Sequence, residues 1–286
     1  MEFKKEEDFI FPARKFKQSK INNYKDCLIQ IPTGRKNNDN VEIKIPCLFL
    51  KNQKSKNLLI SFHCNGIDMF SSFDTVKEVA EQLKMNCLVS EYPGYSIYNS
   101  PKSSTQCLQD SLLIYDFVLQ HMKNITEKNI YIFGRSLGTG PAVYLSSKRN
   151  PAGTFLLSPY TTFGAVAKPH HKEDFYNKLT KHLRSIDFIE NVKCPLCIFH
   201  GNSDKLIDYH EAIELHEKCS KNEKREIHLI DKMGHNDVFN FYNIMLELAK
   251  KFIDKFCPFD NEVNQVDSLV DFDKNLYYFS DVGNEK

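Results

Sequence analysis

The stretch "NIYIFGRSLGTG", residues 129–140, decides the fold. Strand-forming side chains at 130–133 lead directly into a glycine-rich segment in which Ser136 stands between Gly134 and Gly138. This is the G-x-S-x-G pattern of a nucleophile carried on a sharp strand-to-helix turn, and the sequence that follows has helical apolar spacing. Such a turn crowds the positions two before and two after the serine, where only small residues fit. This crowding accounts for glycine at positions 134 and 138.

The same stretch does not suit a phosphate-binding loop. A P-loop needs Lys followed by Ser or Thr directly after its last glycine, and here Gly140 is followed by Pro141. The glycine spacing of a dinucleotide-binding loop is also absent. We therefore predict a nucleophilic serine rather than a phosphate site.

Strand and helix patterns alternate along the chain around this motif. The predicted strands lie at 28–31, 43–50, 58–62, 87–91, 130–133, 154–157, 196–200 and 226–230. Helical patterns separate the later strands, whereas polar turns join the first ones. The sequence thus predicts an α/β protein with a mostly parallel eight-stranded sheet and helices on both faces. Its sheet should begin as an antiparallel meander and continue as βαβ units.

Two regions depart from this alternation. Residues 160–190 are too long for an ordinary connection between strands and are rich in Lys, His and aromatic side chains. They suit a small cap over a site, and a helix with a solvated basic face is an equal alternative. We expect an N-terminal extension at 1–26, the main domain at 27–257 and an acidic tail at 258–286.

Composition limits the class of protein. The chain has 286 residues, 41% of them apolar, with 38 basic against 37 acidic residues and a net charge of +1. This balance gives no electrostatic reason to expect nucleic acid as a partner. No run approaches the roughly 18 apolar residues of a membrane span, and no signal peptide is recognisable. We expect a cytoplasmic location with at most peripheral membrane contact, and reduced cysteines.

A nucleophilic serine needs a base, and the base needs an orienting acid. Asp204 lies in the loop after the predicted strand 196–200, and His235 lies in the loop after 226–230. The order Ser, Asp, His and the shared carboxyl edge of a parallel sheet are those that this hydrolase architecture requires. We predict Ser136, Asp204 and His235 as a catalytic triad.

Alternatives exist for the acid. Asp204 itself could cap the helix that begins near Tyr209, and Asp208 lies near enough to compete. Asp208 is further from the strand end and is the better N-cap. Asp237, two residues after the histidine, could start the last helix.

An oxyanion formed at the serine needs two backbone donors. We predict the amide of Leu137, at the helix start, and that of Asn65, in the loop after the predicted strand 58–62. No metal-binding cluster, cofactor loop or paired-carboxylate site competes, so neither metal nor cofactor is expected.

The chain resembles the α/β-hydrolase superfamily, and within it the alpha/beta hydrolase domain-containing palmitoyl-protein depalmitoylases and the serine-aminopeptidase-like hydrolases. The matching segments span about residues 43–256: "SFHCNGIDM", "EYPGYS", "KNIYIFGRSLGTGPAVYLSSK", "LLSPYTT", "SIDFIENVKCPLCIFHGNSDKLIDYHEA" and "MGHNDVF". The resemblance implies the α/β-hydrolase fold with a small cap, and the same three triad residues.

Two departures from this family stand out. The family usually has His-Gly in the oxyanion loop, whereas this chain has His63-Cys64. A side chain there would narrow the site or shift the Asn65 amide. The depalmitoylases carry a cysteine-rich N-terminus that anchors them when acylated, and residues 1–26 contain no cysteine. Stable membrane attachment is therefore not expected.

The sequence thus predicts a serine hydrolase that cleaves acyl esters or thioesters through an acyl-enzyme. Its expected substrate is an acylated protein or lipid, with the aromatic cap residues Phe163, Phe175 and Tyr176 lining an acyl channel; palmitoyl-protein thioesterase activity is favoured. Within the enzyme class, a monoacylglycerol or lysophospholipid lipase and a peptidase are the alternatives. A non-catalytic scaffold that binds a ligand in the same pocket is the alternative of another class, and Cys64 is the feature in its favour.

Overall fold

A single eight-stranded sheet organises the molecule. The computed structural model describes residues 6–52, 55–167, 173–259 and 272. The strands are β1 (Leu28–Lys36), β2 (Glu42–Leu50), β3 (Leu58–Phe62), β4 (Asn86–Ser90), β5 (Ile130–Arg135), β6 (Gly153–Leu157), β7 (Leu196–Gly201) and β8 (Arg225–Ile230). Their order across the sheet is β1-β2-β4-β3-β5-β6-β7-β8. The predicted α/β class with a mostly parallel sheet is confirmed.

The start of the sheet differs from the predicted meander. Strands β1 and β2 pair antiparallel as expected, but β2 pairs next with β4, also antiparallel. Strand β3 lies deeper and pairs in parallel with β4 and β5. All five residues of β3 are buried, so this strand occupies the centre of the sheet. The chain therefore leaves β2, skips the neighbouring position that β4 later fills, and forms β3 one position further in. The polar residues between β2 and β3 indicate a turn but not this crossing.

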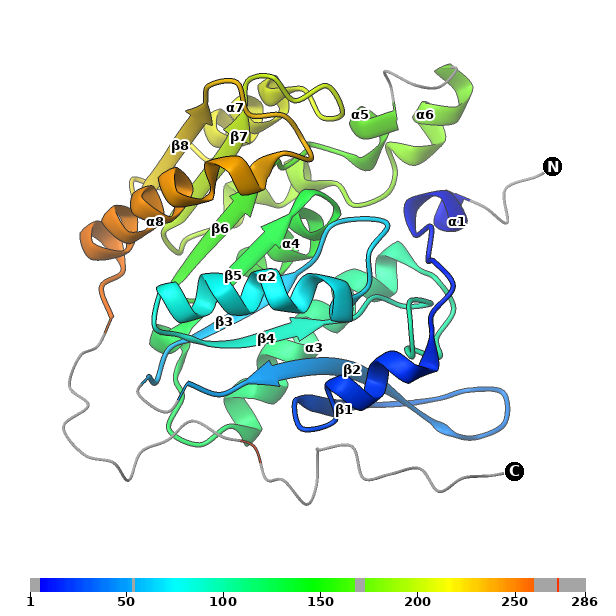
Figure 1. Ribbon diagram of the computed structural model, residues 1–286. Coiled ribbons are helices and arrows are strands. Elements are labelled where there is room, and N and C mark those ends of the chain that lie inside the picture. The colour runs from blue at the N-terminus through cyan, green and yellow to red at the C-terminus, as the bar shows by residue number, and fades with distance from the viewer. Residues whose placement is uncertain (1–5, 53–54, 168–172, 260–271, 273–286) are drawn as a thin grey trace.

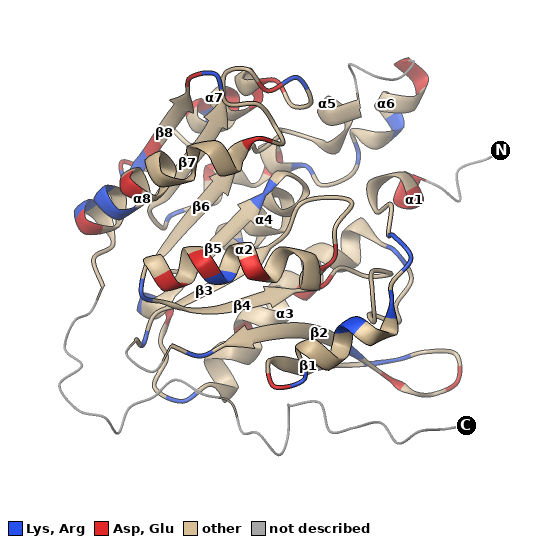
Figure 2. Cartoon of the chain, viewed as in Figure 1, with Lys and Arg blue, Asp and Glu red and all other residues tan. Residues whose placement is uncertain are grey.

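Helices cover both faces of the sheet (Figure 1). One face carries α2 (Met69–Gln82) and α8 (Tyr242–Phe256), and the other carries α3 (Ser104–His121), α4 (Thr139–Lys148) and α7 (Tyr209–Lys218). Each layer has its own buried apolar cluster against the sheet. Figure 2 shows acidic and basic residues interspersed along the outer surfaces of α2 and α8. Within the described residues, no helix is both long and apolar enough to cross a membrane.

The segment predicted as a cap folds into short helices. It contains α5 (Phe163–Ala167), α6 (Glu173–Leu179) and two 3-10 turns, η4 (Ser185–Asp187) and η5 (Ile189–Asn191). Helices α5 and α6 lie at the edge of the sheet where the parallel strands end (Figure 1), and the chain then returns to β7 past α4, where the ring of Phe188 packs against that of Tyr144.

The N-terminal segment packs onto the domain. It forms α1 (Glu6–Ile10) and the 3-10 helix η1 (Gln18–Asn23). Ile10 and Phe11 are completely buried in the core that also holds α3 and α4. The predicted acidic tail lies outside the described residues apart from 258–259 and Phe272, whose ring contacts that of Phe49 at 5.3 Å.

The turn after β5 presses against the end of β3. A Cβ atom on Gly138 would lie 2.1 Å from the carbonyl oxygen of Phe62 and 2.8 Å from that of His63. Real Cβ atoms do not approach backbone oxygens so closely, and backbone cannot give way as a flexible side chain can. Position 138 must therefore be glycine for the two loops to meet.

We predict that Gly138→Ala destabilises the protein by about 1–3 kcal/mol, because the added methyl group overpacks this contact. Urea unfolding at neutral pH measures the change. Gly234→Ala is the matched control, since its Cβ would approach no atom closer than 3.4 Å. Equal unfolding free energies for Gly138→Ala and the unsubstituted protein would contradict the expectation.

Candidate active site

Ser136 lies on a strained turn at the end of β5. Its φ angle is +51°, in the left-handed region that residues other than glycine seldom adopt. The turn continues through the 3-10 helix η3 (Ser136–Gly138) into α4. A Cβ on Gly134 would lie 2.4 Å from the carbonyl oxygen of Gly138, so the turn is as tight as the sequence pattern indicates. This geometry presents the serine hydroxyl above the carboxyl edge of the sheet.

The structure brings Ser136, His235 and Asp204 together. The Nε2 atom of His235 lies 3.1 Å from the Ser136 Oγ, and its Nδ1 lies 2.7 Å from the Asp204 Oδ2. An ionised carboxylate only accepts hydrogen bonds, so Nδ1 donates to Asp204 and Nε2 is left to accept the serine proton. Asp204 and His235 come from the loops after β7 and β8, as the sequence predicts.

Asp204 is held in its ionised form. Burial alone would raise its pKa, but hydrogen bonds from His200 and His235 outweigh burial and hold the pKa well below its usual range. The backbone amides of Leu206 and Ile207 also donate to its Oδ1, at 2.8 and 2.9 Å. Asp204 therefore holds a fixed negative charge beside the histidine at neutral pH.

The two competing aspartates have other partners. Asp208 is the N-cap of α7, where its Oδ1 accepts from the amide of His210 at 3.0 Å. The Oδ1 of Asp237 accepts from the amide of Gly234 at 2.7 Å and so shapes the loop that carries His235. Of the three aspartates, Asp204 is the one whose carboxylate contacts the His235 ring.

Both predicted oxyanion donors border the same cavity as Ser136. This cavity has a volume of about 360 Å³, and its lining includes Leu137 and Asn65. The Leu137 amide lies in the first turn of a helix, where backbone donors have no intrahelical acceptor. The side chain of Asn65 is fixed, because its Oδ1 accepts from the amide of Gly66 at 2.9 Å and from the hydroxyl of Tyr95 at 2.7 Å.

Cys64 does not enter this cavity. It lines a separate cavity on the other side of the oxyanion loop, together with Arg135. Burial raises the pKa of its thiol, so the side chain is neutral. The Cys64 side chain therefore does not narrow the Ser136 cavity, contrary to the prediction.

A buried histidine and glutamate brace the oxyanion loop, the segment after β3 that carries residues 63–67, and neither residue is among the predicted site residues. The Nε2 of His63 lies 2.9 Å from the Oε1 of Glu91, and the hydroxyl of Tyr92 donates to the His63 carbonyl at 2.6 Å. Glu91 also accepts from the amide of Met69, at the start of α2. A charged residue directly after the apolar strand β4 is the signal that could have revealed this brace.

The cavity at Ser136 is mostly apolar and is built from two distant parts of the chain. The cap contributes Phe163 to its wall, as predicted, but Phe175 and Tyr176 are not among the lining residues. Phe175 instead packs edge-to-face against Phe9, with ring centroids 5.0 Å apart. Phe9 and Pro12 of the N-terminal segment line the cavity directly. The apolar run "FIF" in an otherwise charged N-terminus is the signal for this role.

Among the described residues, no group of three His, Cys, Asp or Glu side chains is placed to hold a metal ion. The C-x-x-C pair, Cys194 and Cys197, is buried at β7, and neither thiol forms a disulfide.

Comparison with known proteins agrees with this fold. No family model matches the chain. It is 28% identical to human alpha/beta hydrolase domain-containing protein 17B over 211 residues, which cover 73% of this chain and 71% of the relative. It is 29% identical to putative alpha/beta hydrolase L404 of Acanthamoeba polyphaga mimivirus over 206 residues, covering 69% and 73% of the two chains.

Solved structures are similar at lower identity. The Pyrococcus furiosus esterase Pf2001 superposes with a TM-score of 0.66 at 16% identity, covering 87% of this chain and all of the esterase. The alpha/beta hydrolase GrgF from Penicillium superposes with a TM-score of 0.64 at 12% identity, covering 80% and 98%. The chain has the α/β-hydrolase fold and resembles the alpha/beta hydrolase domain-containing proteins 17B and 17C.

We predict that the Asp204 carboxylate stabilises the fold in a pH-dependent way. Its folded pKa is below the unfolded value of about 3.9, so its stabilising effect is complete above that value and is lost as the pH falls towards the folded pKa. The unfolding free energy of the unsubstituted protein should therefore exceed that of Asp204→Asn most at pH 6–7, and the excess should shrink below about pH 4. Urea titrations across this range test it. An excess that stays constant down to pH 3 would refute it.

Proposed function

We propose that this protein is a serine hydrolase that cleaves acyl esters or thioesters through an acyl-enzyme. The observation that carries the proposal is the continuous hydrogen-bonded chain from Ser136 through His235 to Asp204, with separations of 3.1 and 2.7 Å. Similarity to alpha/beta hydrolase domain-containing proteins supports hydrolase activity.

In the first step the Ser136 hydroxyl attacks the acyl carbonyl carbon while the Nε2 of His235 takes its proton. The Asp204 carboxylate keeps the other ring nitrogen protonated and stabilises the imidazolium that forms. The imidazolium then donates its proton to the leaving alcohol or thiol, and the acyl group remains on Ser136 as an ester. The turn at Ser136, with its positive φ, places the hydroxyl within 3.1 Å of the base.

In the second step a water molecule attacks this ester, and His235 takes the water's proton. Return of that proton to Ser136 releases the carboxylic acid and restores the site. The amides of Leu137 and Asn65 would hold the oxyanion in both steps, each worth roughly 3 kcal/mol by analogy with deletions of such donors. The brace from Glu91 to His63 keeps the Asn65 loop in place.

The proposed substrate is a protein or lipid that carries a long acyl chain, and a palmitoylated protein is favoured. The apolar wall of the Ser136 cavity, built from Phe9, Phe163, Val166 and Ala167, supports an aliphatic acyl group. A monoacylglycerol or lysophospholipid carries the same acyl group on an oxygen leaving group and is the alternative substrate. A peptidase is less suited, because these apolar walls offer few partners for peptide groups.

We predict that a fluorophosphonate probe labels the protein covalently and that Ser136→Ala abolishes labelling. The probe mimics the tetrahedral intermediate and reacts with an activated serine. Ser203→Ala, in an exposed loop, is the matched control and should label as the unsubstituted protein does. Asp204→Asn should slow labelling by about 10³-fold or more, whereas Asp208→Asn should not. A folded protein that does not label would favour the non-catalytic scaffold.

We predict that Ala167→Leu shortens the accepted acyl chain. The leucine side chain would occupy part of the Ser136 cavity that Ala167 now borders. The kcat/KM for a palmitoyl thioester should fall about tenfold or more, and that for the acetyl thioester should change less than about twofold. An equal fall in kcat/KM for both thioesters would show that the acyl chain does not lie beside Ala167. Comparing palmitoyl thioester with monopalmitoylglycerol hydrolysis then decides between thioesterase and lipase.

A further inference from the structure

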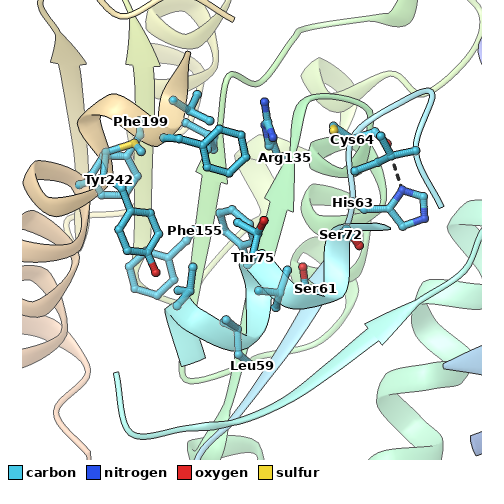
Figure 3. Close-up of a pocket in the computed structure, with 18 of the residues that line it drawn as sticks. Leu59, Ser61, His63, Cys64, Ser72, Thr75, Arg135, Phe155, Phe199 and Tyr242 are labelled. Carbon is cyan, nitrogen blue, oxygen red and sulfur yellow. Dashed lines mark hydrogen bonds between the residues drawn. The ribbon is translucent and has the colours of Figure 1, made fainter. Parts of the chain in front are cut away.

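A second, larger cavity lies on the opposite side of the sheet from α4. Its volume is about 430 Å³, and it opens between α2 and α8 (Figure 3). Ser136 does not line it, although Asn65 borders both cavities. The mechanism proposed above makes no use of this space.

The floor and sides of this cavity, which we call the α2–α8 cavity, are apolar. Four parallel strands supply its floor through Leu59, Phe133, Phe155 and Phe199. Figure 3 shows the rings of Phe155 and Phe199 facing it, with Leu59 at the end furthest from Arg135. A space of this size and lining falls in the range of small-molecule sites, about 300–1,000 Å³.

Two arginines line the cavity, Arg14, which is exposed, and Arg135, which is half-buried. Arg135 projects from the end of β5 beside Cys64, as Figure 3 shows. Its guanidinium donates to the carbonyl of His235 at 3.2 Å and lies 5.9 Å from the ring of Phe239. No carboxylate among the described residues lies within ion-pair distance of it, and the residues that line the cavity include no Asp or Glu. A half-buried guanidinium with only a carbonyl partner is suited to an anion.

The cavity also contains hydroxyl groups without partners. Ser61 is completely buried on the floor, and its Oγ has no hydrogen-bond partner in the described part of the chain. The hydroxyl of the half-buried Tyr242, at the start of α8, also has no hydrogen-bond partner among the described residues.

We propose that the α2–α8 cavity binds a long-chain carboxylate. The alkyl chain would lie over the phenylalanine floor towards Leu59, and the carboxylate would pair with Arg135. This ligand matches both ends of the cavity, an apolar channel closed by an uncompensated cation. Binding needs neither Ser136 nor turnover, so the site is independent of the proposed hydrolysis. Because Arg135 also donates to the His235 carbonyl, it would link the bound carboxylate to the loop that carries the candidate base.

Calorimetric titration of the 286-residue chain with monomeric dodecanoate and with dodecanol tests the proposal, since the two ligands differ only in the charged head. We expect one dodecanoate per chain, bound more tightly than dodecanol. Arg135→Gln should weaken dodecanoate binding about tenfold and leave dodecanol binding unchanged. No dodecanoate binding, or equal weakening of both ligands, would overturn the assignment of Arg135 to the carboxylate.

Two variants locate the ligand. Val79→Phe, on α2, fills the α2–α8 cavity and should weaken both ligands at least tenfold, whereas Ala167→Leu fills the Ser136 cavity and should not. The reverse pattern would show that dodecanoate occupies the Ser136 cavity and would overturn the proposal. If Val79→Phe does not fold by circular dichroism, Thr75→Phe is the second filling variant at the same wall.

Discussion

The close approach of the β5–α4 turn to the end of β3 is the constraint on which the rest of the site depends. Gly138 lies against the carbonyl oxygens of Phe62 and His63, with no space for a Cβ between them. This contact sets how far Ser136 stands from the oxyanion loop, since that loop begins at the same carbonyls. The positive φ of Ser136 is stable only because both neighbouring backbones are fixed in this way.

A parallel sheet then brings the remaining groups together without any local sequence relationship. The loops after β5, β7 and β8 all open at one edge, so residues far apart in the chain reach hydrogen-bond distance. The chemistry of the acid follows from its surroundings. Asp204 stays ionised because His235 and two backbone amides donate to it and His200 lies 3.4 Å away, and together these groups outweigh the cost of its burial.

Two cavities with different linings meet near this edge of the sheet. The smaller one combines the serine with an apolar wall from the cap and the N-terminal segment, and the larger one ends at Arg135. Arg135 is the last residue of β5 and lines the larger cavity together with Phe133, two residues before it, whereas Ser136 lies on the turn that follows the strand. The strand therefore serves the larger cavity and the turn after it serves the smaller one.

The sequence by itself determined the α/β class, the order of the three candidate triad residues and eight strands, seven of them to within two residues of their bounds. The first strand, predicted at 28–31, continues to Lys36. Periodicity and turn chemistry act locally, and they are sufficient for these features. Only the tertiary structure decided that β3 lies between β4 and β5, that Phe9 lines the Ser136 cavity, and that Cys64 faces away from it. Each of these depends on which surfaces far apart in sequence bury one another. A local pattern such as the apolar run at 9–11 indicates that a segment is buried, but not which surface buries it.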